Sequence, residues 1–539
     1  MLTAERHPIS VVPGLHRLFL DYCSGAETVR PFYSSLQAFT NWTARPALPA
    51  HWPELVTLLA EQNPSPSTEA AAALDTLRDG AGVVVTGQQV GLFGGPLFTP
   101  FKAATALARA RQATACGSPH AAIFWLATED HDFAEIDHVV FPARRELRKL
   151  VYSPAGQTPD AAHPAGGIVL DETIAPLIDQ ARELLGDSEA TEALAAAYKP
   201  GRTLGAAFRE FYAKAFAAQG LLLVDASCRT LHRLGAPVLR AAIERADELH
   251  LALVSRNLEL EAAGYHAQVA VAPQSSLLFL IDENGARQAL KHHAPSASEP
   301  DGLWKTGSQS YSTAELLGIL DAEPERISPS ALLRPVFQDS LLSSSVVVGG
   351  PAEIAYFAQS AVLYERILGR VTPSLPRFSA TLIEPAIGEM MRKHELILEQ
   401  VFAETPVSLA QLLAARSMPP EGKEKLTSAG EAMDRELTML VDWMRSLDTG
   451  LGQSGETAAG KIRYQMSRLR TLAANFQMQR EAALVRHAES ISHALYPDGG
   501  LQERLHGAAY YFARYGFELA EALTAQAANS DSGHTELWL

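Results

Sequence analysis

The feature that most constrains the fold is a strand, a glycine-rich loop, a helix and a second strand that follow one another over residues 82–132. GVVVT at residues 82–86 is a short β-branched run, typical of a buried strand in a parallel sheet. A helix is expected after the loop, with Thr99 as its cap and Pro100 at its first position. AAIFWLA at residues 121–127 is the next strand. Both loops then leave the carboxyl ends of neighbouring parallel strands, where open α/β sheets bind ligands.

Three further segments extend this pattern. GLLLVDA at residues 220–226 predicts another buried strand, and residues 345–360 repeat the order strand, Gly-Gly-Pro turn and helix. AQVAVA at residues 267–272 and SLLFLIDENGAR at residues 276–287 differ, because their apolar runs and the Asn-Gly turn predict an antiparallel hairpin. The sequence therefore predicts an α/β fold with a parallel-sheet core and an inserted hairpin.

After residue 383 the pattern changes to long helices. Residues 424–448 place apolar side chains at steps of three and four, typical of a heptad seam, and a second run follows a predicted turn at 448–460. The predicted seam residues are Leu426, Ala429, Met433, Leu437, Leu440, Met444 and Leu447, then Ile462, Met466, Leu469, Ala473, Phe476 and Ala483. Two such antiparallel helices form an arm; the alternative is that they pack as core helices of a bundle.

Composition limits the partners of the chain. Asp and Glu number 61 against 45 Lys and Arg, a formal charge of −16, so the chain repels nucleic acid and anionic membranes. Cys23, Cys116 and Cys228 are too widely separated for a disulfide framework or a zinc site. There is no run of ~18 apolar residues and no signal peptide at the start, so a cytoplasmic protein is expected.

The loop TGQQVGLFGGPLFTPFK at residues 86–102 is the first candidate site. Its glycines let the backbone approach a ligand, and the next helix directs free N–H groups toward an anion. Lys102 can add charge for a phosphate or carboxylate. The candidate binding residues are Gln88, Gln89, Gly91, Gly94, Gly95, Thr99 and Lys102. The spacing matches neither GxGxxG nor GxxxxGK[ST], so a purely structural turn is an equal alternative from the residues alone.

The second candidate site is the acidic segment Glu129, Asp130, His131 and Asp132, which directly follows the second strand. Three carboxylates around a histidine push one another's pKa values apart, a frequent active-site arrangement. Such a group can take a proton from an attacking amine or hold Mg²⁺ on a nucleotide. The alternative is a solvated acidic loop. A metal site through His131 and His138 has no recognised ligand spacing, so no structural metal is expected.

The third candidate site combines RPVFQD at residues 334–339 with the Gly-Gly-Pro turn downstream. Arg334 can bind a carboxylate or phosphate through two N–H groups, and Arg377 is a second candidate of this kind. The other candidate binding residues are Gln338, Asp339, Gly349, Gly350 and Glu353. In the alternative, Arg334 pairs with a surface acid and the glycines only turn the chain.

Taken in order, TGQQVGLFGGPLFTPFK, FWLATEDHDFAEIDHV and LLRPVFQDSLL with VVVGGPAEIAYFAQ resemble the bacillithiol-synthesis cysteine-adding (BshC) family. The resemblance implies a Rossmann-like core over residues 1–383, similar to class I aminoacyl-tRNA synthetases and nucleotidyl transferases, with a hairpin insert at about 262–310. It also implies a coiled-coil arm over 384–496 that forms a homodimer, and a segment 497–539 that packs back on the core.

The same resemblance implies a ligase that adds cysteine to the amine of glucosaminyl-malate. In this hypothesis ATP activates the cysteine carboxylate as an adenylate or acyl phosphate. The 87–102 loop holds the phosphate, and Glu129, Asp130 or His131 accepts the amine proton. Two alternatives stay open: a related nucleotidyl transferase or ligase with another amine acceptor, and a non-catalytic coiled-coil dimer that binds a nucleotide.

Overall fold

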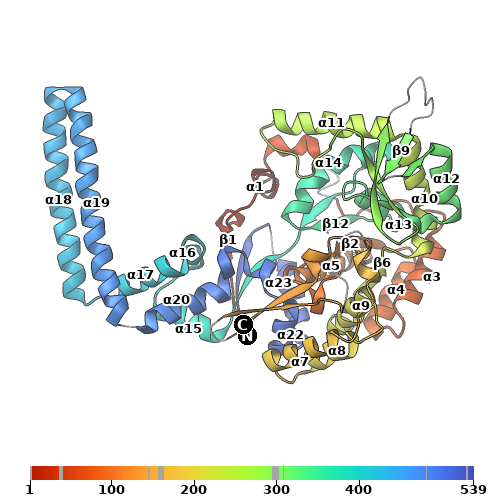
Figure 1. The fold of residues 1–539 in the computed structure, drawn as a ribbon, viewed down its shortest axis with the longest axis horizontal. Coiled ribbons are helices and arrows are strands. Elements are labelled where there is room, and N and C mark those ends of the chain that lie inside the picture. The colour runs from red at the N-terminus through yellow and green to blue at the C-terminus, as the bar shows by residue number, and fades with distance from the viewer. Residues whose placement is uncertain are drawn as a thin grey trace.

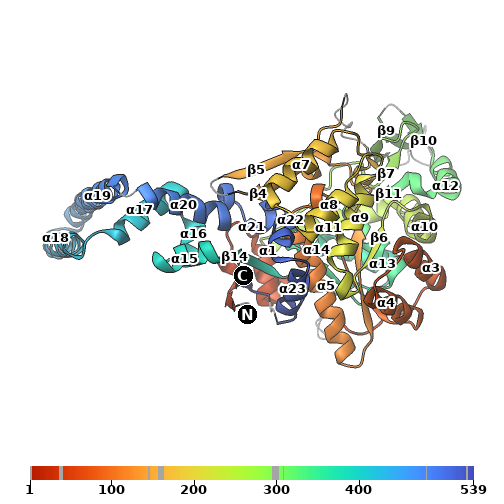
Figure 2. The same cartoon turned by 90° about the horizontal axis from the view of Figure 1, so that it is seen from below.

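The computed structural model describes residues 3–34, 41–143, 146–155, 163–293, 303–307, 309–480, 482–529 and 532–539. These residues form an α/β core from which two long helices project as an arm (Figure 1). Seen from below, the arm lies to one side of the core (Figure 2). The predicted fold class, a parallel-sheet α/β core with a helical arm, is confirmed.

A five-stranded parallel sheet forms the centre of the core. Its order is β13-β12-β2-β3-β6, with bounds Ser374–Pro376, Val346–Gly349, Gly82–Gln88, His120–Leu126 and Leu222–Asp225. β2 pairs with β3 along its whole length, from Gly82 opposite His120 to Gln88 opposite Leu126. The strand order runs outward from β2 in both directions, so it reverses between β2 and β12. The strands predicted at 82–86, 121–127 and 220–226 are confirmed.

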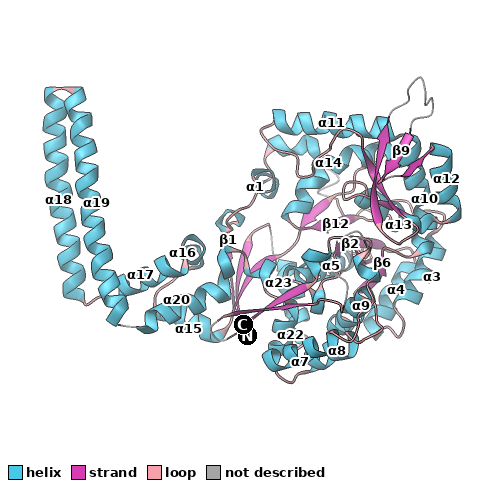
Figure 3. Ribbon diagram, viewed as in Figure 1, coloured by secondary structure: helices cyan, strands magenta, loops and turns pink. Residues whose placement is uncertain are grey.

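Helices cover both faces of this sheet (Figure 3). Val84 packs in one apolar cluster with α5, α9, α22 and α23, whereas Val83 and Val85 pack in another with α3, α4, α10, α13 and α14. The bounds of these helices are Phe98–Ala115, Leu204–Ala215, Ala508–Tyr515, Glu518–Asn529, Trp52–Gln62, Thr68–Arg78, Arg229–Glu244, Arg334–Leu342 and Pro351–Leu368. A strand that is buried on both faces needs apolar residues throughout, which explains the β-branched run of β2.

The helix after β2 begins earlier than predicted. α5 starts at Phe98 and no side chain caps it, so Thr99 is not the N-cap. The Thr99 amide donates to the carbonyl oxygen of Pro96 (2.9 Å), and its side chain is buried inside the first turn. Lys102 is consequently the fifth helical residue rather than the third.

A second sheet of five antiparallel strands packs beside the first. Its order is β10-β9-β8-β7-β11, with bounds Gln309–Tyr311, Leu303–Thr306, Arg287–His293, Ser275–Ile281 and Ile327–Pro329. β7 and β8 form the predicted hairpin, but the strand predicted at 267–272 is wrong. The Val269 amide donates to Oε1 of buried Gln359 (2.9 Å), and Nε2 of Gln359 donates to the Val269 carbonyl oxygen (2.8 Å). These two bonds take the place of those that a neighbouring strand would make. Residues 294–302 of the predicted insert lie outside the described residues.

The two ends of the chain pair with each other. β1 (Thr3–His7) runs antiparallel to β15 (His534–Trp538), which runs parallel to β14 (Ser379–Ile383). The N and C labels accordingly lie side by side in Figures 1 and 2. α23 packs along α5, so the C-terminal segment contacts the helix that follows the glycine-rich loop.

Helices α15 to α20 connect the core to the tip of the arm. Their bounds are Pro385–Lys393, Leu398–Ala403, Pro406–Ser417, Pro420–Leu447, Thr449–Arg480 and Ala482–Leu495. α18 and α19 form the arm and are joined at Asp448 alone, so the turn predicted at 448–460 is wrong beyond that residue. Small residues explain the error, because Gly452 and Gly455 let α19 pack closely on α18 instead of breaking the helix.

The contact between α18 and α19 uses a different face from much of the predicted seam. Gly430 and Val441 of α18 and Gly452, Ala459 and Met466 of α19 are buried. Five predicted seam residues are instead between 44% and 62% exposed, namely Leu440, Leu447, Ile462, Leu469 and Phe476. These five residues do not form the contact between α18 and α19, because the small residues permit the closer approach on their own side.

The remaining elements are shorter or peripheral. They are α1, α6, α7, α8, α11, α12, α21, β4 and β5, with bounds Arg17–Ser24, Phe133–Ile136, Ile174–Leu185, Glu189–Ala197, Ala246–Ala262, Thr313–Ala322, Gln502–Leu505, His138–Pro142 and Leu147–Val151. Throughout the described ranges, every helix is too short or too polar to pass through a lipid bilayer.

Close packing in the arm predicts opposite effects for two glycines of α19. A Cβ atom at Gly452 would lie 2.8 Å from the Cα of Arg445, whereas a Cβ at Gly460 would meet nothing within 4 Å. Gly452→Ala is expected to lower the melting temperature of the arm. Gly460→Ala is expected to raise it, because Ala favours a helix interior by roughly 1 kcal/mol over Gly. Thermal unfolding followed by circular dichroism measures both; shifts of the same sign would contradict the close contact.

Candidate functional site

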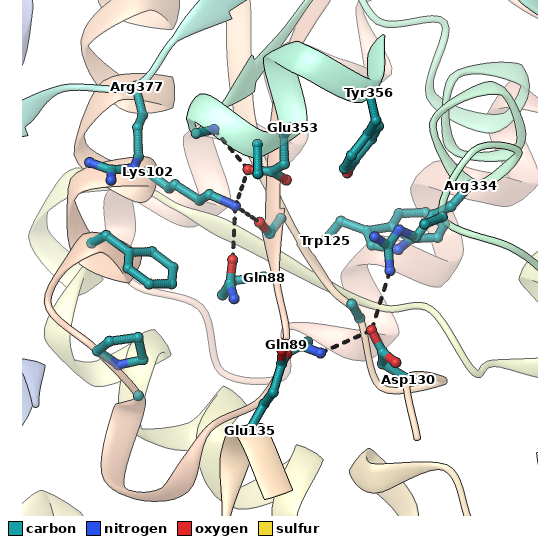
Figure 4. A pocket seen from close by; sticks show the side chains of 18 of the residues that line it. Gln88, Gln89, Lys102, Trp125, Asp130, Glu135, Arg334, Glu353, Tyr356 and Arg377 are labelled. Carbon is teal, nitrogen blue, oxygen red and sulfur yellow. Dashed lines mark hydrogen bonds and ion pairs between the residues drawn. The ribbon is translucent and has the colours of Figure 1, made fainter. Parts of the chain in front are cut away.

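A cavity of about 700 Å³ lies at the carboxyl ends of β2, β3 and β12, where the strand order reverses. Cavities of this size hold small-molecule ligands, and this position is the usual binding crevice of open α/β sheets. Figure 4 shows side chains from all three predicted segments around it. Of the predicted site residues, it is lined by Gln88, Gln89, Gly91, Gly95, Lys102, Asp130, Arg334, Gln338, Gly350, Glu353 and Arg377.

Two buried tyrosines fix the glycine-rich loop. The Gly94 amide donates to the hydroxyl of Tyr198 (3.0 Å), and the hydroxyl of Tyr212 donates to the Gly94 carbonyl (2.9 Å). Gly94 and Gly95 have φ values of +87° and +67°, which glycine adopts without strain. Gly94 does not line the cavity, because the two tyrosines hold both its N–H and its carbonyl group on the side away from the cavity. The buried Thr99 does not line it either.

Lys102 joins the loop after β2 to the start of α14 (Figure 4). Its Nζ donates to the carbonyl oxygen of Gly87 (2.7 Å) and Oε1 of Gln88 (2.8 Å), and it pairs with Oε2 of Glu353 (2.5 Å). Burial lowers the pKa of Lys102, and the Glu353 carboxylate opposes that shift. The three contacts use all three N–H donors of the ammonium group. The predicted contact with a phosphate would therefore have to replace one of them.

Asp130 is the member of the acidic segment that faces the cavity. Nε2 of Gln89 donates to its Oδ2 (3.0 Å), and Nη1 of Arg334 lies 3.8 Å from the same oxygen (Figure 4). Burial alone would raise the pKa of Asp130, but the guanidinium groups of Arg334 and Arg287 lower it below its ordinary value. A carboxylate that stays charged at neutral pH suits the binding of an ammonium group and is a weak proton acceptor.

The other three predicted catalytic residues do not line the cavity. Glu129 is buried and pairs with His232 of α10 (2.6 Å); burial alone would lower the pKa of His232, but Glu129 raises it. Nδ1 of His131 accepts a hydrogen bond from Nη1 of Arg287 (2.9 Å), and burial and that guanidinium lower the histidine pKa. Asp132 is exposed. The side chains of these consecutive residues thus point in different directions, and the sequence alone does not show which of them faces the cavity.

Arg334 and Gln338 lie one turn apart on α13 and both line the cavity. Asp339 does not line it, because it is buried against Arg370 and accepts a hydrogen bond from the Thr372 hydroxyl (2.8 Å). The predicted role of Arg334 in binding an anion is compatible with its position, whereas Asp339 has a structural contact.

Three helices begin at the cavity wall. Phe98, Arg334 and Pro351 are the first residues of α5, α13 and α14, and all three line the cavity. Helix N-termini carry partial positive charge and favour anions. Gly350 lines the cavity just before α14, whereas Gly349 does not line it.

Arg377 lines the cavity but already has an acidic partner. Its Nη1 donates to Oε2 of Glu503 (2.9 Å) and to the carbonyl oxygen of Phe378 (2.8 Å), and its Nη2 donates to Oε1 of Glu503. The neighbouring Arg504 also lines the cavity, and no carboxylate of the described chain lies within ion-pair distance of it. Arg504 is therefore more available to an anionic ligand than the predicted Arg377.

Several lining residues were not among the predicted site residues, namely Glu135, His138, Gln268, Tyr356 and Arg504. Tyr356 follows Glu353 by three residues on α14, a helical spacing that could have identified it. Asp137 contacts His138 through Nδ1 of the imidazole ring, with 2.8 Å between this nitrogen and Oδ1 of Asp137. The other ring nitrogen of His138, Nε2, does not take part in this contact. Arg504 and Gln268 come from segments whose approach to the cavity depends on the tertiary fold.

The cavity thus combines charges of both signs. Arg334, Arg504 and three helix N-termini can hold an anion, and the charged Asp130 can hold an ammonium group. Together with the doubly wound sheet and the appended helical arm, this defines an α/β protein with a polar, charged cavity of small-molecule size at the point of strand reversal.

Comparisons identify the family. The model described as "Bacillithiol biosynthesis BshC, N-terminal Rossmann-like domain" matches residues 5–378, and the BshC "C-terminal coiled-coil domain" matches residues 380–538. The chain therefore belongs to the BshC family of bacillithiol biosynthesis, which confirms the resemblance inferred from its motifs.

Similar proteins cover almost the whole chain. A protein of Koribacter versatilis named "Putative cysteine ligase BshC" is 41% identical over 96% of both chains. Proteins with the same name from Solibacter usitatus and Salinibacter ruber are 34% and 30% identical, over 95% and 98% of both chains.

The contacts of Lys102 predict a large effect on stability. Glu353→Gln leaves the ammonium group of Lys102 buried without an anion, and we expect a loss of about 3–5 kcal/mol in the free energy of unfolding. Lys102→Met combined with Glu353→Gln should recover most of that loss. Urea unfolding followed by circular dichroism measures each variant. Glu421→Gln, which removes the exposed pair of Glu421 and Lys425, is the control and should leave unfolding unchanged.

Proposed function

We propose that this chain is a ligase that joins the carboxylate of cysteine to the amine of glucosaminyl-malate. The observation that carries the proposal is the cavity itself, in which a charged carboxylate and groups that bind anions come together at one sheet edge. The names of the relatives support the cysteine-adding activity. Glucosaminyl-malate carries carboxylates and an amine, which match the two kinds of charge in the cavity.

The anionic groups of the substrates bind at the starts of α13 and α14. Arg334 offers two N–H groups to a carboxylate, and Arg504 adds a second cation on another wall of the cavity. The hydroxyl of Tyr356 contacts Arg334 and orients it, and burial raises the pKa of this tyrosine to about 12, so it remains a neutral hydrogen-bond donor. Asp130 holds an ammonium group beside them.

A nucleotide fits the same groups. Its phosphates carry the charge that the helix N-termini, Arg334 and Arg504 can bind, and Mg²⁺ would accompany them. The nucleotide would supply the leaving group that a cysteine carboxylate needs before an amine can attack it. The glycine-rich loop and the helix N-termini would hold this leaving group, and Asp130 would orient the amine.

His138 is the lining residue best placed to accept the amine proton. The Asp137 carboxylate contacts Nδ1 (2.8 Å), which fixes the ring and leaves Nε2 as the acceptor. The predicted acceptors fit less well, because Glu129 is paired with His232 and Nδ1 of His131 is bonded to Arg287.

The proposal predicts a new product. Purified protein incubated with cysteine, glucosaminyl-malate and ATP should yield the amide of the two substrates, identified by mass spectrometry. Asp130→Asn removes the charge that holds the amine and should lower kcat/KM by roughly 10²-fold. Asp132→Asn is the matched control, since Asp132 lies two residues away, is exposed and does not line the cavity.

Absence of the amide under all nucleotide conditions, with the protein folded, would contradict the proposal. Formation of an amide from cysteine and a different amine would instead support a related ligase with another acceptor.

We further propose that the arm forms a homodimer. Ile462, Leu469 and Phe476 recur every seven residues along α19 and are exposed, as are Leu440 and Leu447 of α18. Exposed apolar residues at heptad spacing are typical of a coiled-coil interface. A second copy of the arm would bury them.

Sedimentation velocity tests the dimer. The wild-type protein is expected to sediment as a dimer, and Leu469→Glu with Phe476→Glu is expected to sediment as a monomer, because both changes place charge in the apolar stripe. Thr471→Glu, an exposed position between them, is the control and should remain dimeric. A monomeric wild-type protein at every concentration would contradict the proposal.

A further inference from the structure

A cluster of carboxylates around a histidine lies where the two ends of the chain pair, and it shares no residue with the cavity. Glu5 of β1 is directly opposite Glu536 of β15 in their antiparallel register. His7 lies two residues after Glu5, on the same face of the strand. One ligand atom from each of these three side chains lies within 4.8 Å of the others.

The charges in this cluster are not balanced by protein cations. Like charges directly opposite on neighbouring strands repel each other. Glu536 is only 4% exposed, and among the described side chains His7 alone bonds its carboxylate (Nε2 to Oε2, 3.2 Å). No Lys or Arg of the described chain forms an ion pair with Glu5, Glu399 or Glu536. With Glu5, Glu399 and Glu536 all ionised, these groups keep a net charge of −2 even when His7 is protonated.

Glu399 of α16 completes an arrangement that is common around metals. Its Oε1 lies 3.1 Å from Nδ1 of His7, while Nε2 of the same ring faces Glu536. A histidine that binds a metal through one nitrogen usually donates its other N–H to a carboxylate, which fixes the ring. His534, the residue opposite His7, does not compete, because its two ring nitrogens bond the hydroxyls of Ser379 and Thr381.

We propose that Glu5, His7 and Glu536 bind a divalent transition-metal ion, with Glu399 as the outer partner of His7. One imidazole and two carboxylates suit Zn²⁺, which takes nitrogen and oxygen ligands at about 2.0–2.2 Å and completes its shell with water. Glu5 is exposed, so its side chain can rotate to close the site around the ion. The bound ion offsets the repulsion between Glu5 and Glu536.

Such an ion would tie three parts of the molecule together. Glu5 and His7 belong to the first strand, Glu536 to the last, and Glu399 to the helices that lead to the arm. The ion is therefore expected to stabilise the junction between the core and the helical part, without touching the cavity.

Calorimetric titration of the full-length, EDTA-dialysed protein with Zn²⁺ alone tests the proposal. The wild-type protein is expected to bind an ion that raises its melting temperature. Glu5→Gln and Glu536→Gln are expected to abolish both effects, and Glu399→Gln is expected to weaken binding by roughly 10- to 100-fold. Glu389→Gln, an exposed glutamate of α15, is the matched control and should behave as wild type.

Two outcomes would overturn the proposal. One is the absence of Zn²⁺ binding by the wild-type protein, and the other is equal binding by the wild-type protein and the Glu5→Gln variant. Glu5 is exposed, so its replacement leaves the fold intact, and circular dichroism of this variant checks that loss of binding is not loss of folding. Product formation from cysteine is unaffected in either case, which separates this test from that of the proposed ligase activity.

Discussion

The ion pair between buried Lys102 and half-buried Glu353 holds the cavity together. It lies where the strand order reverses, and it connects the loop after β2 and helix α5 to the first turn of α14. Lys102 is only 2% exposed, and its buried ammonium group requires an anion nearby, so the two halves of the sheet cannot separate without leaving that charge unpaired. Glu353 also accepts a hydrogen bond from the Gly350 amide, so one carboxylate fixes both walls.

The inserted antiparallel sheet also contributes to the cavity, because its Arg287 contacts the acidic turn that carries Asp130. Arg287 of β8 donates to the Ser328 hydroxyl and to the Pro329 carbonyl (both 2.9 Å), and its guanidinium lies 3.8 Å from the ring centre of Phe279. The remaining N–H groups of this fixed guanidinium include the donor to His131, next to Asp130. The insert therefore sets the direction of the acidic turn, and through it the position of the carboxylate that faces the cavity.

Local patterns in the sequence predicted the elements that depend on local physics. A β-branched run identified β2 and apolar runs identified β3 and β6, and the glycine-rich and acidic segments both followed strands whose ends meet. The wrong predictions concern segments whose structure depends on contacts with residues distant in the sequence. Gln359 takes the backbone bonds that 267–272 would need as a strand, and close packing against α18 keeps 449–460 helical. Likewise, only the positions of His232 and Arg287 explain why Asp130 alone of its segment lines the cavity.

The buried carboxylate where the two chain ends pair differs from the other buried carboxylates of the protein in its ion-pair partners. Glu129, Asp339 and Glu503 are buried carboxylates, and each meets a cationic partner at close range, namely His232, Arg370 and Arg377. Glu536 is buried to the same degree, but its one partner, His7, is shared with Glu399, and Glu5 lies opposite. Burial of a carboxylate is costly without a full positive charge nearby. For Glu129, Asp339 and Glu503 the protein supplies this positive charge. For Glu536 the protein does not, and the proposed metal ion would supply it.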